Sequence, residues 1–250
     1  MTVRQSWEVY ERMIARLMAD QLTTELCVTP NARLVGEISR RSRQIDVLID
    51  SRHDNDPSRR VVVDAKKRKR KIDVTDVEAF RGLMEDVGAS HGFLVCPAGH
   101  TKAAEKRAQL AVSICLVPLD HIPNFDPMAW PRCTDTRCLH GRIFWDGYPE
   151  FSVKALPIGG LAQGGAKIFT YVHHVGKCDR CGQFHVLCLS CAQILSVPEG
   201  ALTGVGVRCR CQMPWFWRTS AQHDRRGSLF AELRVTLATG EIKTVDRRPF

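Results

Sequence analysis

Two short stretches decide the fold expected of this sequence: Arg43-Gln-Ile-Asp46-Val-Leu-Ile49 and Val61-Val-Val-Asp64-Ala-Lys66. The first alternates with the period of a strand and the second is rich in β-branched residues, so both are predicted to be β-strands. The segment between them, His53-Asp-Asn-Asp-Pro-Ser58, has the composition of a turn. Together they predict an antiparallel hairpin.

The register of this hairpin follows from a turn centred on Asn55. Such a turn pairs residues that lie equally far from it along the chain, which sets Asp46 opposite Asp64 and Gln44 opposite Lys66. Because side chains alternate between the faces of a strand, these four polar groups are expected at one end of one face. The other face is expected to pack on a helix, and its members are Ile45, Val47, Ile49, Val61, Val63 and Ala65.

The opposed carboxylates predict a metal site. Directly opposed residues of an antiparallel pair lie about 4.5–5.5 Å apart at Cβ, and two ionised carboxylates at that distance repel unless a cation lies between them. Mg²⁺ binds carboxylate oxygens together with water and phosphate oxygens. A lysine on the same face can stabilise developing charge or help to position and deprotonate a water. Asp46, Asp64 and Lys66 therefore suit the hydrolysis of a phosphodiester.

These residues resemble the PD-(D/E)xK nuclease motif, and more narrowly the catalytic domain of Mrr-type restriction endonucleases. The resemblance covers about residues 5–122 and includes the stretch from Gly82 to Gly92. It implies a divalent-metal-dependent DNA endonuclease in which Asp46 and Asp64 bind Mg²⁺ and Lys66 is the catalytic lysine.

The same resemblance implies roles for further residues. Gln44 matches a recurrent polar residue beside the first aspartate, and Glu11 matches an acidic residue that the family often adds from its first helix. Glu37 is a second candidate for this third carboxylate. An isoleucine rather than a proline precedes the first aspartate, as is common in this branch. The second acidic position is Asp64, where Mrr-type members often carry Glu or Gln.

Apolar periodicity predicts alternating helices and strands in the first half. Their order, α-β-β-β-α-β-α-β, is typical of a three-layer α/β fold around a mixed sheet, here the restriction-endonuclease-like core. Thr75-x-x-Glu78 has the spacing of a capping box for the second helix, and Gly88 is a natural stop for it. Helices are expected near 6–22, 76–87 and 101–112, and strands near 34–38, 45–49, 61–63, 92–96 and 114–118.

Positive charge is dense beside the predicted site. Eight cations lie between residues 59 and 71, where Asp64 is the one anion, and Arg40, Arg41 and Arg43 precede the first site strand. This density suits a phosphate backbone, although a solvated basic loop explains it equally well. No aromatic residue interleaves with the cations, so base stacking is not indicated.

The eleven cysteines are unevenly spread. Cys178-x-x-Cys181 and Cys188-x-x-Cys191 are knuckles of the kind that binds Zn²⁺, and Cys209-x-Cys211 adds two thiols. In a cytosolic chain such clusters are more often metal ligands than disulfides. We therefore expect structural Zn²⁺ here, and metal-coupled folding, because the segment has few large aliphatic side chains of its own.

Which cysteines share a metal stays open. One set joins the two knuckles; another joins the first knuckle to Cys209 and Cys211; and all six can share two ions. An iron–sulfur cluster is the competing cofactor. Cys133 and Cys138, with His140, offer part of a further metal site, but are interpreted as a chance pair. Cys27, Cys96 and Cys115 are interpreted as small buried hydrophobes, and Trp215, Phe216 and Trp217 are expected to pack against the knuckles.

After Pro123 the sequence is rich in proline and glycine, with short strands expected near 142–145 and 167–173 and a terminal hairpin from 229–237 and 241–245. No internal repeat is apparent. The second half is therefore expected to be a small, loop-rich, zinc-binding β region. The expected division is a nuclease domain (1–122), a linker with short strands (123–170), a cysteine-rich zinc module (171–220) and a C-terminal hairpin with tail (221–250).

Composition sets the outer limits on function. The chain has 250 residues, a formal net charge of +9 and 44% hydrophobic residues, which excludes a disordered or coiled-coil chain. No apolar run is long enough for a membrane span and no secretory signal is visible, so a cytoplasmic location is expected.

The predicted function is a Mg²⁺-dependent DNA endonuclease, with a restriction or defence role implied by the resemblance. The zinc module would orient DNA or dock a partner. One alternative is a non-catalytic nucleic-acid-binding or adaptor protein, and another is a repair or RNA-directed nuclease. Double-strand cleavage with one site per chain would favour a homodimer.

Overall fold

The computed structural model describes the chain in these ranges: 7–21, 25–52, 59–66, 68–110, 114–118, 130–147, 150–155, 167–200, 206–211, 214–223, 229–237 and 239–249. The chain divides into two compact units. The first comprises Met1–Pro131, Ala221–Phe230 and Arg248–Phe250, and the second comprises Arg132–Ser220 and Ala231–Arg247. None of the helices in the described ranges is long and apolar enough to cross a membrane.

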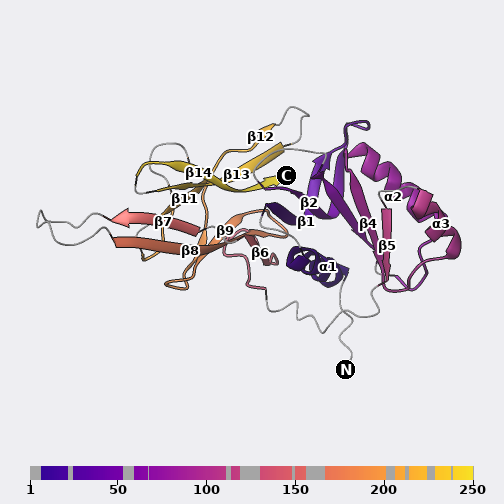
Figure 1. Cartoon of the computed structure of the whole chain (residues 1–250), viewed down its shortest axis with the longest axis horizontal. Coiled ribbons are helices and arrows are strands. Elements are labelled where there is room, and N and C mark those ends of the chain that lie inside the picture. Colours follow the sequence, from indigo (N-terminus) through magenta and orange to yellow (C-terminus); the bar gives the residue numbers. More distant parts are fainter. Residues whose placement is uncertain are drawn as a thin grey trace, which may run out of the picture. The chain divides into compact units, whose positions relative to one another are not determined.

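The first unit has the element order predicted from the sequence (Figure 1). Its strands form one sheet in the order β1-β2-β3-β4-β5, with antiparallel pairing from β1 to β3 and parallel pairing from β3 to β5. The sheet is therefore mixed, as expected. The elements are α1 (Trp7–Gln21), β1 (Leu26–Val35), β2 (Ser42–Ser51), β3 (Val61–Ala65), α2 (Val74–Asp86), β4 (His91–Cys96), α3 (Lys102–Leu110) and β5 (Ile114–Pro118).

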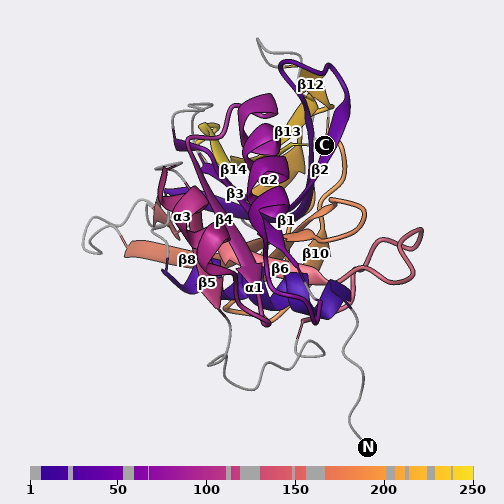
Figure 2. The same cartoon turned by 90° about the vertical axis from the view of Figure 1, so that its right-hand side faces the viewer.

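Helices on both faces of this sheet complete the three layers. α1 packs against β1, β2 and β3. The connections β3–α2–β4 and β4–α3–β5 both join neighbouring parallel strands in the same direction, and the fixed hand of such crossovers places α2 and α3 together on one face. They lie on the side of the sheet away from α1 (Figures 1 and 2).

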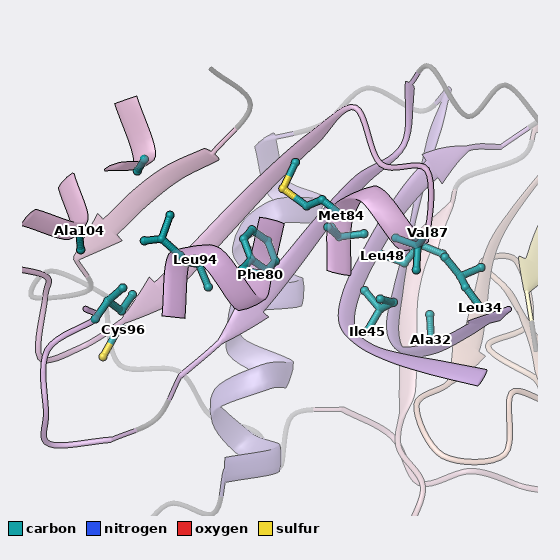
Figure 3. Packing of buried hydrophobic residues seen from close by; sticks show 14 residues of the cluster. Ala32, Leu34, Ile45, Leu48, Phe80, Met84, Val87, Leu94, Cys96 and Ala104 are labelled. Atoms are coloured by element: carbon teal, nitrogen blue, oxygen red, sulfur yellow. The ribbon is translucent and has the colours of Figure 1, made fainter. Parts of the chain in front are cut away.

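The core beneath α2 holds the site strands in place. Phe80 and Met84 of α2 belong to one buried cluster with Leu48 of β2 and Leu94 of β4 (Figure 3). A Cβ atom at Gly92 would lie 2.5 Å from the Met84 sulfur and 2.6 Å from the Phe80 ring. Only glycine therefore lets the helix lie this close to β4.

The first strand is longer than the sequence indicated. β1 runs over Leu26–Val35, whereas the pattern predicted a strand only near 34–38. Pro30 obscured the signal, because proline lacks the N–H that a central strand needs. β1 lies at the edge of the sheet, where proline is tolerated, and Pro30 pairs with Val47.

The capping of α2 also differs from the prediction. The N-cap is Asp73, whose side chain accepts from the Asp76 N–H at 3.1 Å while Asp76 accepts from the Asp73 N–H at 3.0 Å. The box expected from Thr75 and Glu78 is therefore wrong, because an equally spaced acidic pair lies two residues earlier. Thr101 does cap α3, since its hydroxyl accepts a backbone N–H at 3.1 Å.

One member of the predicted apolar face is misplaced. Ile45 belongs to the cluster of Leu48 under α2, although strict alternation would separate the two. Val47, between them, is fully buried but outside that cluster. The alternation breaks at Asp46, opposite Asn31, whose φ of 52° is left-handed. The pairing of β1 with β2 continues on both sides of this irregularity.

The described part of the chain after residue 131 forms antiparallel sheets. One sheet has the order β10-β9-β8-β6, with β7 also paired to β8, and the other has the order β11-β13-β12, with β14 paired to β13. The expected strands near 142–145 and 167–173 and the terminal hairpin are present. The bounds are β6 (Ile143–Gly147), β7 (Glu150–Ala155), β8 (Lys167–Cys178), β9 (Phe184–Cys188), β10 (Ile194–Ser196), β11 (Trp215–Arg218), β12 (Gln222–His223), β13 (Leu229–Thr236) and β14 (Ile242–Pro249).

The cysteine region packs on an apolar core that it shares with strands outside it. Phe144, Phe184 and Phe216 are each at most 1% exposed, and the Phe216 ring lies 5.0 Å from the ring of the buried His173. These side chains come from strands spread over some 70 residues of sequence (144 to 216), which is why the cysteine block alone seemed poor in core residues.

A buried ion cluster lies in the second unit. The Lys177 ammonium on β8 lies 2.9 Å from Oδ2 of Asp246 on β14 and 3.3 Å from Oδ2 of Asp146 on β6. The side chains of all three are at most 1% exposed. Such a cluster depends on every member, because an unpaired charge in this environment is costly.

Candidate active site and cysteine clusters

The hairpin of β2 and β3 has the register predicted from the sequence. Val47 pairs with Val63, Leu48 with Val62, and Ile49 with Val61. The turn residues 53–58 lie outside the described part of the chain. Asp46 and Asp64 stand one step beyond Val47 and Val63, at the end of the hairpin nearest Ala65.

Three polar side chains meet at this end. The Asp46 carboxylate accepts from the Ala65 N–H at 2.8 Å, and the Lys66 ammonium lies 2.7 Å from Oδ2 of Asp64. The Asp64 side chain is 16% exposed and that of Lys66 35% exposed, so the group is open to solvent on one side. The Lys66 N–H donates to the Val95 carbonyl at 2.7 Å, which ties the site to β4.

The electrostatics of the pair favour a bound cation. Burial raises the pKa of Asp46 to about 6, and the nearby charge of Asp64 acts in the same direction, while the Ala65 N–H and Lys66 oppose the shift. The two carboxylates therefore resist being ionised together unless a further positive charge offsets them. Their oxygens are the ligand type that Mg²⁺ takes in proteins.

The remaining predicted site residues are placed differently. Gln44 is exposed and donates from Nε2 to Oδ1 of Asn31 at 3.0 Å. Glu37 lies in the turn beyond β1, and Asp46 stands four residues into β2, about 13 Å along the strand from its start. The interpretation of Glu37 as the third carboxylate stays a prediction. Glu11 lies half-buried on α1, and its role stays a prediction.

Much of the basic density beside the site is neutralised within the fold. Arg60 is only 5% exposed and pairs with Asp50 while donating to a backbone carbonyl. Arg68 and Arg70 both pair with Asp76 at the start of α2. Part of the positive charge between residues 59 and 71 therefore stabilises the fold through ion pairs. Six described cations of this region are exposed, and of these Arg59 and Arg70 are paired with acidic groups; the others are Arg40, Arg41, Lys69 and Lys71.

Eight cysteines of the second unit form two groups. The sulfur atoms within each group all lie within 4.8 Å of one another, and the groups are Cys133, Cys138, Cys178 and Cys181, and Cys188, Cys191, Cys209 and Cys211. Neither four-cysteine set considered from the sequence is the one that the fold assembles. Cys133 and Cys138 are not a chance pair, because β6 and β8 bring them to the first knuckle. His140 is exposed and belongs to neither group.

The sequence did contain one indication that Cys133 and Cys138 are metal ligands. Their Cys-x₄-Cys spacing lies within the range of zinc ligands. Forty residues separate Cys138 from Cys178, so spacing alone did not show which thiols they would join. Among the single cysteines, Cys27 and Cys96 are buried as expected. The side chain of Cys115 lies outside the part that the structure describes.

The sulfur geometry suits tetrahedral metal ions. Zn–S bonds of about 2.3 Å place neighbouring sulfurs of a tetrahedron about 3.8 Å apart. The sulfur atoms of Cys133 and Cys181 are 3.7 Å apart, those of Cys138 and Cys178 are 3.7 Å apart, and those of Cys188 and Cys211 are 3.9 Å apart. Both groups therefore fit an ion of this kind.

Two further observations agree with this fit. A Cβ atom at Gly141 would lie 2.3 Å from the Cys178 sulfur and 2.6 Å from the Cys138 sulfur, so the backbone leaves room for the cluster only because this residue is glycine. Burial raises the pKa values of the Cys133 and Cys209 thiols to about 12. Close, buried thiols ionise only when a cation stabilises the thiolates.

The two knuckles repeat one backbone turn. The Gly182 N–H donates to the Cys178 carbonyl at 3.1 Å, and the Ala192 N–H donates to the Cys188 carbonyl at 2.8 Å. Gly182 and Ala192 both have left-handed φ values, 74° and 56°. The unit thus contains a short structural repeat that the sequence analysis did not identify, because only the two cysteines and a following glutamine recur in it.

A mixed sheet between helical layers, with two opposed carboxylates and a lysine at its hairpin, defines a restriction-endonuclease-like domain. Comparison with known families agrees: residues 3–124 match the Mrr catalytic-domain family, described as restriction endonuclease. Residues 3–124 are thus similar to a restriction endonuclease domain of the Mrr type, which supports a nuclease.

No curated protein sequence matches the chain. Among solved structures, the chain is similar to the crystal structure of a protein of unknown function, AF1548, with 18% sequence identity and a TM-score of 0.37. The similarity covers 44% of this chain and 57% of that one, so the chain spans little more than half of that structure's length.

Proposed function

We propose that the chain is a Mg²⁺-dependent endonuclease that hydrolyses phosphodiester bonds of DNA. The observation that carries the proposal is the meeting of Asp46, Asp64 and Lys66 at one open end of a hairpin within a restriction endonuclease domain. A binding module has no need of two opposed carboxylates beside bound phosphates, which argues against a non-catalytic adaptor.

Each of these groups has a distinct task. Asp46 and Asp64 supply the oxygens that hold the cation, and the Ala65 N–H orients the Asp46 carboxylate for this. When bound, a divalent cation polarises a phosphoryl oxygen and offsets the charge that develops there. The Lys66 ammonium, held 2.7 Å from Asp64, is placed to donate to the scissile phosphate or to the attacking water.

The test is cleavage of supercoiled plasmid and linear duplex DNA in MgCl₂ by the wild type and by Asp64→Ala and Lys66→Ala. We expect each variant to lose about 10²–10³-fold in rate, as for other single electrostatic groups of an active site. Lys69→Ala is the matched control, because Lys69 is an exposed lysine three residues away, and its rate should stay within a factor of two. Equal rates in all four proteins would refute the site.

Two parallel assays separate the alternative functions. Tight, salt-sensitive DNA binding without Asp64-dependent cleavage would favour an adaptor. Faster cleavage of single-stranded RNA than of duplex DNA, again dependent on Asp64, would favour an RNA-directed nuclease.

We also propose that each four-cysteine group holds one structural Zn²⁺. Four sulfur ligands close the coordination shell, so these ions would stabilise the second unit rather than take part in chemistry. Metal analysis should find two zinc ions per chain, falling to one in Cys133→Ser/Cys138→Ser and to one in Cys209→Ser/Cys211→Ser. Retention of two ions in the Cys133→Ser/Cys138→Ser variant would contradict the assignment. Detection of iron together with sulfide would show that the cysteines hold an iron–sulfur cluster instead of zinc.

The proposal extends to the biological role, the location and the oligomeric state of the protein. We propose a role in restriction or defence, a cytoplasmic location, and a homodimer for cleavage of both strands, since one chain carries one hairpin site of this kind in its described part. Light scattering on the protein with and without duplex DNA tests the homodimer, and a mass of one chain under both conditions would refute it.

A further inference from the structure

The turn between β1 and β2 is braced by a buried carboxylate from another element. Asp86, the last residue of α2, is 5% exposed. Its carboxylate accepts from the Ile38 N–H at 3.1 Å, the Ser39 N–H at 2.8 Å and the Ser39 hydroxyl at 2.7 Å. Hydrogen bonds to an ionised acceptor are stronger than neutral ones, so this carboxylate fixes the backbone at the tip of the turn.

The turn leaves little room for other conformations. A Cβ atom at Gly36 would lie 2.4 Å and 2.5 Å from the two Asp86 carboxylate oxygens, so glycine is required. Within the turn, the Gly36 N–H donates to the Arg41 carbonyl at 2.8 Å and the Arg40 N–H donates to the Gly36 carbonyl at 3.0 Å. Arg43, at the start of β2, adds an ion pair to Asp86 at 3.3 Å.

This rigid turn presents an apolar side chain to solvent. Ile38 is 67% exposed although it is large and apolar, and Asp86 holds its backbone N–H at 3.1 Å. Arg40 and Arg41 beside it are both exposed, and Arg40 has a left-handed φ of 56°, a conformation that costs energy for a non-glycine residue. The one acidic side chain of the turn, Glu37, is half-buried.

We propose that this turn is a DNA-contacting wedge, an inference that rests on the proposed action on DNA. Ile38 enters a groove of the duplex, and Arg40 and Arg41 bind the phosphates beside it. Rigidly held apolar side chains flanked by cations contact base steps in this way in minor-groove binding proteins. The charge of the two arginines complements the phosphate backbone.

The spacing of the wedge and the hairpin site suits one duplex. Arg41 precedes Asp46 by five residues in the strand direction, which is about 17 Å at the rise of a β-strand. At about 3.4 Å per base pair this corresponds to about five base pairs. The wedge would therefore bind DNA beside the scissile phosphate and set the distance of cleavage from the contacted step.

The first test measures binding without cleavage. Asp64→Ala serves as the background, and a fluorescein-labelled duplex of about 30 base pairs is titrated by fluorescence anisotropy. Ile38→Ala should weaken the affinity about tenfold. Ile242→Ala is the matched control, because Ile242 is a 45% exposed isoleucine on β14, and its affinity should stay within a factor of two. Equal affinities of the two variants would overturn the proposal.

The second test separates the apolar contact from the ionic ones. The double variant Arg40→Ala/Arg41→Ala should lose two phosphate contacts. The magnitude of the slope of log affinity against log salt concentration should therefore fall by about 1.8. Ile38→Ala should leave this slope unchanged. An unchanged slope in the double variant would overturn the role of the arginines.

A third measurement shows whether the turn binds DNA or a second copy of the chain, and it tests the wedge independently of the nuclease activity. Sedimentation of the same variants tests self-association, and a loss of dimer in Ile38→Ala without loss of DNA affinity would show that the turn binds a second copy instead, which overturns the wedge. Because binding is read in a cleavage-deficient background, a wild type that fails to cleave refutes the nuclease and leaves this result standing.

Discussion

Replacing Asp46 by asparagine should stabilise the first unit when no divalent cation is bound. The pKa of Asp46 in the fold is raised from 3.8 to about 6, chiefly by burial. Between about pH 4 and pH 6 the unfolded chain therefore releases this proton while the folded chain keeps it. The free energy of unfolding falls over that interval and stays low above it.

The size of the effect follows from the shift. At about 1.4 kcal/mol per pKa unit, the ionised Asp46 costs the folded protein about 3 kcal/mol above pH 6. Asparagine keeps an acceptor for the Ala65 N–H, which lies 2.8 Å from the carboxylate, so no buried donor is left without a partner. The asparagine also loses the attraction between the Asp46 charge and Lys66. We therefore expect the variant to raise the free energy of unfolding by about 2–3 kcal/mol at pH 8, and by about half of that at pH 5.

Hydrogen exchange read by mass spectrometry on the amides of β3 and β4 measures the stability of the first unit in the full chain. At pH 8 without added Mg²⁺, Asp46→Asn should exchange these amides about 30–150-fold more slowly than the wild type. Added Mg²⁺ should slow exchange in the wild type and not in the variant. Equal exchange in the two proteins at pH 8, or the same difference at pH 5 and pH 8, would refute the reasoning.

Three further predictions concern packing and charge. Ala192→Gly should raise the free energy of unfolding by about 0.5–1 kcal/mol, because Ala192 has a left-handed φ of 56°, whereas Gly182→Ala at the equivalent position should lower it by about 1 kcal/mol; urea unfolding checks both, and shifts of the same sign would contradict the repeat. Asp86→Ala removes the acceptor of three hydrogen bonds and should cost about 3 kcal/mol, seen as faster exchange in β1 and β2. An unchanged rate there would show that the turn does not depend on Asp86. Lys177→Met should cost about 3–5 kcal/mol in urea unfolding, because the fully buried Asp246 loses its counter-ion; a cost below about 1 kcal/mol would mean that Asp246 is protonated in the variant.

The hairpin that carries Asp46 and Asp64 could be read from the sequence because its geometry is local. The alternation of apolar residues, the β-branched run and the turn composition all indicate one register, and the structure has that register. The alternation rule failed at Ile45, where Asn31 on the neighbouring strand adopts a left-handed conformation. That irregularity belongs to the pairing of two strands and has no signature within either one.

The cysteines show the same limit over a longer distance. The CxxC spacings indicated metal binding, because the knuckle is a local turn whose hydrogen bonds lie within six residues. The partners of each knuckle were not indicated by spacing. Cys138 joins Cys178 from forty residues away, through the pairing of β6 with β8.

The sequence by itself determined the element order of the first unit, the register of the site hairpin, and the presence of metal-binding knuckles, since each depends on periodicity or spacing over a few residues. Only the tertiary structure decided which thiols form each cluster, which cations are neutralised, and that Asp86 braces a turn 47 residues away. Contacts of that kind arise when separate elements pack, and the packing depends on the shape of the whole core rather than on any segment.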